Sequence, residues 1–377
     1  MARTSALLST VIVVLSCLVS RVPAQTTVNP DISLIPRFRL ESSDAGSRGL
    51  RAPNFTLDEL ELAVQAYVNP YARADVFLTK PGVGDEPIEV EEAYATFLRG
   101  LPLDLNIKIG KYRTEFGKLN TVHPHIWPFV TTPLSIARFL GPDGLSDLGI
   151  GASVLIPTGD VVYTRLSIDV LRGGQFHTIE QQTGSLSGGV GLSDTLGRQP
   201  AWGTAGRLMS FFPVSENGDL EVGISGMTGV HDPYHDLHFF YGGVDFKYKW
   251  KPDGYTSLTV QGEGLANVRS VAGSGGGGSF RTADLTTGGG YVYGDLQFQK
   301  QYSIGARLDR SESPYATADR ATGISVFAGY YPVEETTAFR LEYQRLRLET
   351  PDGRASSVNT VALQFMFSMG PHKAHPF

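Results

Sequence analysis

The most constraining feature of this sequence is an alternation of apolar and polar residues that recurs along most of its length. Between Leu166 and Val170, for example, apolar side chains alternate with Ser167 and Asp169. Successive side chains of a β-strand point to opposite faces, so each such segment predicts a strand with one apolar and one polar face. The polar faces repeatedly carry full charges.

We expect about sixteen strands, an even number, as in single-chain bacterial outer-membrane barrels. The expected strands lie near residues 32–40, 57–68, 71–80, 88–98, 103–111, 147–157, 161–171, 201–214, 218–230, 237–250, 255–266, 289–300, 302–311, 322–332, 336–349 and 357–368. Pro36 interrupts the first of these, so that segment is either a barrel strand or a segment lying inside the barrel.

The connections between the expected strands alternate between long and tight. Segments 112–146, 172–200 and 267–288 are long, whereas 158–160 is a tight turn. Outer-membrane barrels have short periplasmic turns and long extracellular loops, and a soluble sandwich requires no such parity. The sequence therefore predicts an all-β transmembrane antiparallel up-and-down β-barrel of about 16 strands, wide enough for an aqueous channel. A soluble periplasmic sandwich is the alternative.

The N-terminal residues have the pattern of a secretory signal peptide. An apolar run, Ala6–Val19, follows a basic residue and precedes the small residue Ala24, which indicates a signal peptide over 1–24. The rest, 25–377, then forms a single barrel domain. Cys17 is the one cysteine of the chain, so the mature protein has no disulfide and no thiolate metal site.

The charge balance limits the partners. The chain has 32 Lys and Arg against 38 Asp and Glu, a formal net charge of −6. Nucleic-acid-binding proteins carry basic surfaces, so we expect no nucleic-acid partner. The expected partners are outer-membrane lipid and small hydrophilic solutes or ions.

One stretch resembles known outer-membrane proteins in detail. Residues 108–120 read K-I-G-K-Y-R-T-E-F-G-K-L-N, which is similar to a strand-to-loop segment of the phosphate-selective porins and of poorly characterised "zinc-regulated" outer-membrane proteins. Residues 91–97, 123–129 and the His-containing tail 369–377 strengthen the second resemblance. The resemblance implies a barrel in the bacterial outer membrane, a porin-like channel and, by family analogy, a homotrimer.

The polar faces supply the residues expected to line the lumen. They are Lys108, Lys111, Arg113, Arg165, Asp169, Glu221, Asp245, Lys247, Arg307, Asp309, Arg340 and Glu342. Their mixed signs predict a hydrated lumen without a strong preference for anions. The segment 112–146 either folds into the pore as a constriction or forms a solvated extracellular loop; the sequence leaves both open.

Histidines in the expected loops are candidate metal ligands. His123 and His125 flank a proline, and His231 and His235 lie four residues apart. Neutral imidazole suits zinc, copper and nickel, but a zinc site needs at least three protein ligands and no single segment provides them. Either these residues bind zinc or they are ordinary loop residues. No cofactor is required by the remaining sequence.

These patterns lead to one main functional hypothesis. We expect a porin-like channel for passive diffusion of small hydrophilic solutes or ions. The alternative is a barrel that binds or takes up a divalent transition metal such as zinc through its loop histidines. An outer-membrane enzyme is a third hypothesis, but the chain has no Gly-x-Ser-x-Gly turn and no serine placed beside a His–Asp pair, so we expect no catalytic residues.

Overall fold

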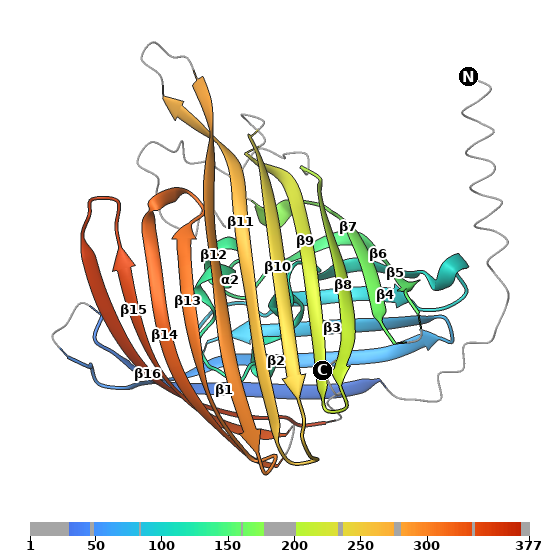
Figure 1. The fold of residues 1–377 in the computed structure, drawn as a ribbon, viewed down its shortest axis with the longest axis horizontal. Helices are drawn as coiled ribbons and strands as arrows, with labels where there is room; N and C mark the ends of the chain where they lie inside the picture. Colours follow the sequence, from blue (N-terminus) through green and yellow to red (C-terminus); the bar gives the residue numbers. More distant parts are fainter. Residues whose placement is uncertain are drawn as a thin grey trace.

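The computed structural model describes residues 30–45, 49–82, 84–159, 161–176, 201–232, 237–274, 280–333 and 336–370. They form a closed barrel of sixteen antiparallel strands, in which each strand pairs with its neighbours in sequence (Figure 1). The predicted fold class is confirmed. The predicted signal peptide, 1–24, and most of the tail 369–377 lie outside the described residues.

The strands follow the expected segments closely. They are β1 (Asp31–Ser43), β2 (Asn54–Asn69), β3 (Ala72–Pro81), β4 (Glu89–Phe97), β5 (Asn106–Arg113), β6 (Ser146–Pro157), β7 (Tyr163–Leu171), β8 (Gly203–Ser215), β9 (Gly218–Asp232), β10 (Leu237–Trp250), β11 (Ser257–Ser274), β12 (Phe280–Phe298), β13 (Tyr302–Ser313), β14 (Ala316–Val333), β15 (Thr337–Glu349) and β16 (Ala355–Phe367). The expected alternation of long and tight connections holds only in part. The connection 114–145 is long, but 314–315 between β13 and β14 is tight where a long loop was expected, and 251–256 between β10 and β11 is longer than the expected turn. Most of the expected loop 172–200 lies outside the described residues.

The first strand belongs to the barrel and closes it. β1 pairs with β2 along its length and with β16 from Arg37 to Ser43. Pro36 lies just before the ladder with β16 begins, so its missing N–H removes no hydrogen bond there. Of the two expectations for this segment, the barrel strand is confirmed.

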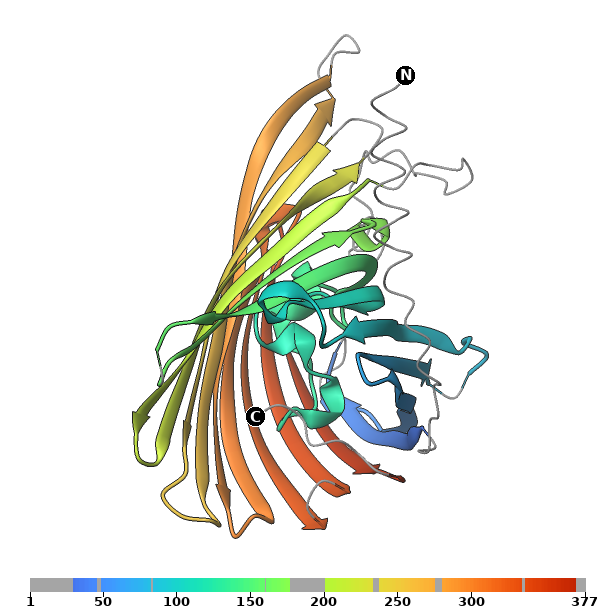
Figure 2. The same ribbon diagram turned by 90° about the vertical axis from the view of Figure 1, so that its right-hand side faces the viewer.

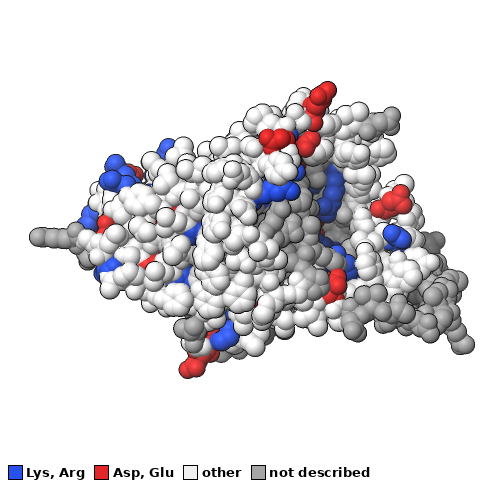
Figure 3. All heavy atoms as spheres, turned by 90° about the horizontal axis from the view of Figure 1, so that it is seen from below, with Lys and Arg blue, Asp and Glu red and all other residues white. Residues whose placement is uncertain are grey.

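The outer face of the wall is apolar. Ile224 on β9 is 57% exposed and pairs with Val244 on β10, which is 61% exposed. The same pattern continues where Leu308 on β13 pairs with Ile324 on β14. In the view of Figure 3, uncharged side chains cover most of the surface, and charged ones form scattered groups. Such an outer face is stable against lipid and costly against water.

Aromatic rings form a ladder around part of this outer face. The rings of adjacent strands stack on one another, with centroids 4.8 to 6.3 Å apart. The ladder contains, in spatial order, Phe298, Tyr302, Tyr330, Phe339, Phe365, Phe38 and Phe55. Phe298 and Tyr302 flank a tight turn, so this end of the ladder lies where interfacial aromatic girdles occur.

The segment 267–288 differs from the prediction that it is a loop. β11 continues to Ser274 and β12 begins at Phe280, and the two strands pair up to Ser274 opposite Phe280. The hairpin rises beyond its neighbours in Figure 1. Its Gly, Ser and Thr content resembles that of a loop, but two strands that are already paired extend their ladder without needing an apolar lipid-facing side.

In the part of the chain that the structure describes, helices are few and short. They are η1 (Pro102–Asp104), η2 (Leu119–Thr121), η3 (Pro124–Ile126), α2 (Leu134–Phe139) and η4 (Gly174–Phe176). No helix in the described ranges is long and apolar enough to cross a membrane. η2, η3 and α2 all belong to the connection between β5 and β6.

Candidate functional site

The connection between β5 and β6, residues 114–145, folds into the barrel; we call it the inner loop. Figure 2 shows it in teal, enclosed by the walls. Its apolar residues are buried together with inward side chains of the strands in one cluster. From the inner loop this cluster contains Phe116, Leu119, Trp127, Phe129, Ile136, Phe139, Leu140 and Leu145. A solvated loop would leave these side chains in water, so the alternative of a solvated extracellular loop is wrong.

The barrel wall holds the inner loop by charged side chains on distant strands. Glu342 on β15 accepts hydrogen bonds from the backbone N–H groups of Val130 (2.6 Å) and Thr131 (2.8 Å). Arg307 on β13 donates to the carbonyl of Thr131 at 2.7 Å. Asp309 on β13 accepts from the N–H of Leu134 at 3.1 Å. Charge-assisted bonds of this kind are stronger than neutral ones, so they fix the loop's path.

A neighbouring part of the wall makes a second set of attachments. Lys118 forms an ion pair with Glu221 on β9 at 2.7 Å. Glu263 on β11 accepts from the N–H of Leu119 at 2.6 Å. The inner loop thus crosses the interior from the β9–β11 side to the β13–β15 side, which narrows the lumen.

Asn120 joins the two ends of the inner loop. Its amide nitrogen donates to the carbonyls of Thr114 (2.7 Å) and Leu145 (3.1 Å), and its oxygen accepts from the N–H of Leu145 (2.7 Å). Three backbone groups that are removed from water are satisfied by one buried side chain. Asn120 therefore holds the first and last residues of the inner loop next to each other.

Glu115 anchors the start of the inner loop to β7. Its carboxylate accepts from Arg165 at 2.5 Å and from Ser167 at 2.7 Å. Burial alone would raise the pKa of Glu115, but Arg165 and Lys108 outweigh this effect and hold the pKa below its usual range. The group is therefore ionised at neutral pH.

Most of the predicted lumen residues lie on the inner face. Nine contact the inner loop or another inward group by a hydrogen bond, an ion pair or a cation–π contact; these are Lys108, Arg113, Arg165, Asp169, Glu221, Asp245, Arg307, Asp309 and Arg340. Glu342 holds the loop as described above, and Lys247 alternates on β10 with the outward residue Phe246.

Lys111 is an exception. It pairs with Leu148 on β6 and lies two residues after Ile109, on the same face of β5; the side chains of Leu148 and Ile109 are both exposed on the outer face. Its ammonium group donates to the carbonyl of Val90 at 2.6 Å. The prediction that Lys111 lines the lumen is wrong, because β5 continues past it to Arg113 and the alternation continues with it.

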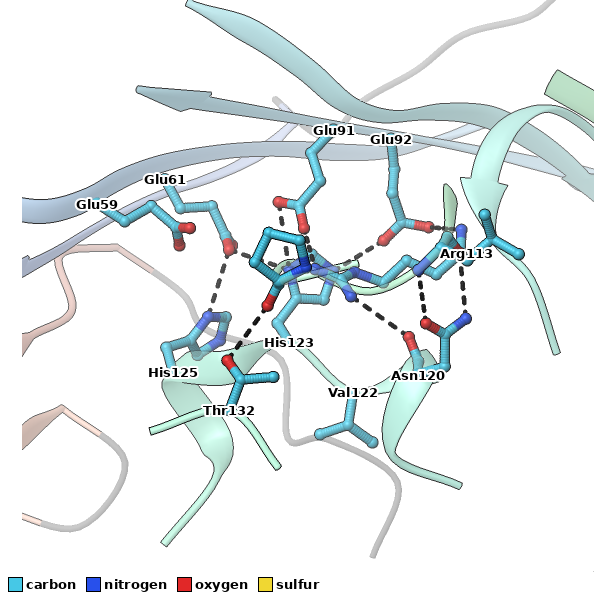
Figure 4. A network of polar contacts seen from close by, with 12 residues as sticks. Glu59, Glu61, Glu91, Glu92, Arg113, Asn120, Val122, His123, His125 and Thr132 are labelled. Carbon is cyan, nitrogen blue, oxygen red and sulfur yellow. Dashed lines mark hydrogen bonds and ion pairs between the residues drawn. The ribbon is translucent and has the colours of Figure 1, made fainter. Parts of the chain in front are cut away.

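A compact cluster of acidic and imidazole groups lies where the inner loop meets β2 and β4 (Figure 4). His123 is extended, as a residue before proline should be, and the turn of η3 returns His125 to the same side. The ring centroids are 5.6 Å apart. Both rings reach Glu61 on β2, with Nδ1 to Oε2 distances of 3.1 Å for His123 and 3.3 Å for His125.

Further carboxylates complete the surroundings of His123. Its Nε2 lies 2.8 Å from Oε1 of Glu92, and its Nδ1 lies 3.7 Å from Oε2 of Glu91. Glu91 also pairs with Arg113, and Glu92 accepts from the N–H of Arg113. Burial alone would lower the pKa of His123, but Glu61 and Glu91 outweigh it and raise the pKa to about 10. The cluster therefore favours a cation at this point.

The other predicted metal ligands do not join this cluster. His231 lies on β9, and its Nε2 is 2.9 Å from the carbonyl of Ser270. His235 lies outside the described residues. Among the residues that the structure describes, Glu61, His123 and His125 form the one group of three metal-binding side chains with close ligand atoms. Sequence reasoning missed Glu61, although the alternation of Glu59 and Glu61 with leucines signals an inward face.

A relative that aligns with nearly the whole chain decides the family. A protein of Aquifex aeolicus, described as "Uncharacterized protein", is 30% identical over 401 aligned positions that cover 94% of this chain and 81% of the relative. This chain belongs to the same family as the Aquifex protein. No protein-family model matches it.

Solved structures share the fold of this family member. The outer-membrane channel DcaP of Acinetobacter baumannii has a TM-score of 0.56 at 13% identity, covering 91% of this chain and 99% of that one. Salmonella typhi OmpF has a TM-score of 0.56 at 10% identity, covering 90% and 97%. An anion-selective porin from Comamonas acidovorans has a TM-score of 0.54 at 10% identity, covering 90% and 99%. With its apolar outer face, the family member has the closed sixteen-stranded barrel fold of these outer-membrane proteins.

Proposed function

We propose that this protein is a channel through which small hydrophilic solutes diffuse passively across the outer membrane. The observation that carries the proposal is the inner loop, which crosses a charged interior inside a wall that is apolar outside. A charged interior holds water, and a loop fixed across it sets an upper size for solutes. The names of the structures with this fold, which include a channel and porins, support the same function.

The charges that remain accessible suggest which solutes pass more easily. On β5–β10 the inward acids Asp169, Glu221 and Asp245 are buried, and each contacts a polar or basic partner. The inward charged side chains there that keep exposed surface are mostly basic. One is acidic, Asp219, and it pairs across the strands with Lys249. The basic ones are Lys108, Arg165, Lys247 and Lys249. The mixed signs counted from the sequence therefore overstate the acidic side of the lumen, and we propose a preference for anions.

Planar-bilayer recordings of the refolded, full-length protein test both the passive conduction and the preference for anions. A steady open conductance is expected, with a reversal potential in a KCl gradient that shows chloride preference. The double variant Lys247→Gln, Lys249→Gln should lose much of that preference, whereas Arg345→Gln, Arg347→Gln on β15, at exposed positions, should leave it unchanged. A folded barrel without conductance would overturn the channel, and an unchanged reversal potential in the first variant would overturn the anion preference.

We further propose a homotrimer. The support is the family analogy and the description of one structure with the same fold, Vibrio cholerae OmpT, as a trimer form. Native mass spectrometry of protein extracted in mild detergent should give three chains per particle. A single chain per particle at all concentrations would contradict it.

A further inference from the structure

The cluster at the junction of the inner loop with β2 and β4 has the geometry of a metal site. We propose that Glu61, His123 and His125 bind one divalent transition metal ion, with Glu91 as a fourth ligand, and that this ion clips the inner loop to the barrel wall. The proposal concerns the attachment of the loop and does not depend on conduction.

The spacing of the ligand atoms supports tetrahedral coordination. Bonds of about 2.0–2.2 Å place neighbouring ligand atoms of a tetrahedral zinc site roughly 3.3 Å apart. Oε2 of Glu61 is 3.1 Å from Nδ1 of His123 and 3.3 Å from Nδ1 of His125. Nδ1 of His123 is 3.7 Å from Oε2 of Glu91. All three atoms of the Glu61, His123 and His125 group lie within 4.8 Å of one another.

A second layer of contacts orients the first. A metal-binding histidine usually donates its other N–H to a carboxylate, which fixes the tautomer and aims the free nitrogen at the metal. Nε2 of His123 lies 2.8 Å from Glu92, so its Nδ1 is directed toward Glu61. Glu92 is itself held by the N–H of Arg113 at 2.8 Å. In Figure 4 the side chains of Glu61, Glu91 and Glu92 approach His123 from the side of the strands.

Burial and charge also favour a cation here. Glu61, His123 and His125 are all buried, and Oε2 of Glu91 is a buried atom that accepts no hydrogen bond from the described residues. Imidazole with carboxylate suits zinc, cobalt, nickel or copper better than the hard ions magnesium and calcium, which prefer oxygen alone. The class of ligand is therefore a divalent transition metal.

Cobalt(II) titration of the refolded, full-length protein tests the site, because tetrahedral cobalt(II) absorbs strongly in the visible range. One ion per chain with a tetrahedral spectrum is expected. His125→Gln and Glu61→Gln should weaken binding at least tenfold, and Glu92→Gln should weaken it about 10- to 100-fold through His123. His231→Gln, which changes a buried histidine elsewhere, is the matched control and should bind as the wild type does.

A measurement on the wild-type protein tests the metal site even if the variants do not fold. X-ray absorption of the zinc-loaded protein should show two imidazoles and oxygen ligands in a four-coordinate site. Zinc should also raise the thermal midpoint, since a ligand that binds the folded state stabilises it. Absence of a one-to-one complex, fewer than two imidazoles, or equal affinity in His125→Gln and wild type would each overturn the proposal.

Discussion

The carboxylate of Glu342 lies 2.6 Å from the backbone nitrogen of Val130, although the two residues are 212 positions apart in the chain. This contact attaches the inner loop to β15, a strand that is not a neighbour of β5 or β6 in the barrel. It identifies Glu342 as a structural residue of the constriction and not only as a charge in the lumen. Removing this carboxylate should therefore loosen the inner loop while the barrel strands stay paired.

Replacing Glu342 by Gln should loosen the inner loop. The neutral amide cannot accept the bonds from Val130 and Thr131 with the same strength, and it leaves Arg307 without one nearby charge. A loss of about 1–3 kcal/mol in the free energy of unfolding is expected. Single-channel recordings should show larger current fluctuations. Glu349→Gln, an ion-paired glutamate at the exposed end of the same strand, is the control, and equal noise in both variants would contradict the assignment.

Replacing Asn120 by Ala should open the base of the inner loop. The change leaves the buried N–H of Leu145 without its partner. The carbonyls of Thr114 and Leu145 each lose one bond and keep the one from the N–H of Phe116 and of Thr114, respectively. A loss of about 1–3 kcal/mol is expected from the unsatisfied N–H. Urea unfolding in detergent measures it, with Asn69→Ala, in an exposed turn, as the comparison. A midpoint within error of wild type would show that Asn120 is not needed to hold the base of the loop.

Replacing Ile224 by Arg should hinder membrane insertion. The side chain is on the outer face between apolar neighbours on β8 and β10, where an arginine costs about 2–4 kcal/mol near the bilayer midplane. Refolding yield into lipid vesicles should fall. Ser356→Arg, at the exposed start of β16, should refold like wild type, and a similar yield for both variants would be evidence against a lipid-facing Ile224.

Acidification should release the start of the inner loop at low pH only. The pKa of Glu115 is held below its usual value of 4.5, so its pairing with Arg165 stabilises the fold above that value and is lost as the pH falls through the lowered pKa. Current noise should stay low from pH 7 to about 5 and rise below 4. Glu115→Gln should already be noisy at pH 7. Wild-type noise that begins near pH 6 would point to other groups.

The strands could be predicted from the sequence because each one carries its own signal. The alternation of Ile168 and Val170 with Ser167 and Asp169 is local, and it fixes which face meets lipid wherever the strand is placed. The same rule gives Lys111 to the outer face, and the prediction failed there because β5 was expected to end at that residue. The prediction that β11 ends at Ala266 was wrong for a related reason. Two strands that are already paired can continue their ladder although the sequence no longer alternates between apolar and polar residues.

The inner loop and its cluster could not be predicted in the same way. A phenylalanine such as Phe129 and a proline-flanked histidine such as His123 are compatible with either a buried or an exposed loop. What decides between them is contact with residues far away in sequence, such as Glu61, 62 positions from His123. The chemistry of imidazole marked His123 and His125 as candidate ligands. The carboxylate that they share is Glu61 on β2, and it lies beside them only because the inner loop folds into the barrel.

The pairing of β1 with β16 has a consequence for how the protein is made. The last strand to leave the ribosome, Ala355–Phe367, is the one that the first strand needs as its neighbour. Until it arrives, two strand edges stay unpaired, and unpaired edges invite aggregation. A chain that stops short of β16 therefore leaves β1 and β15 each with an unpaired edge, and this barrel closes only after its last strand has been made.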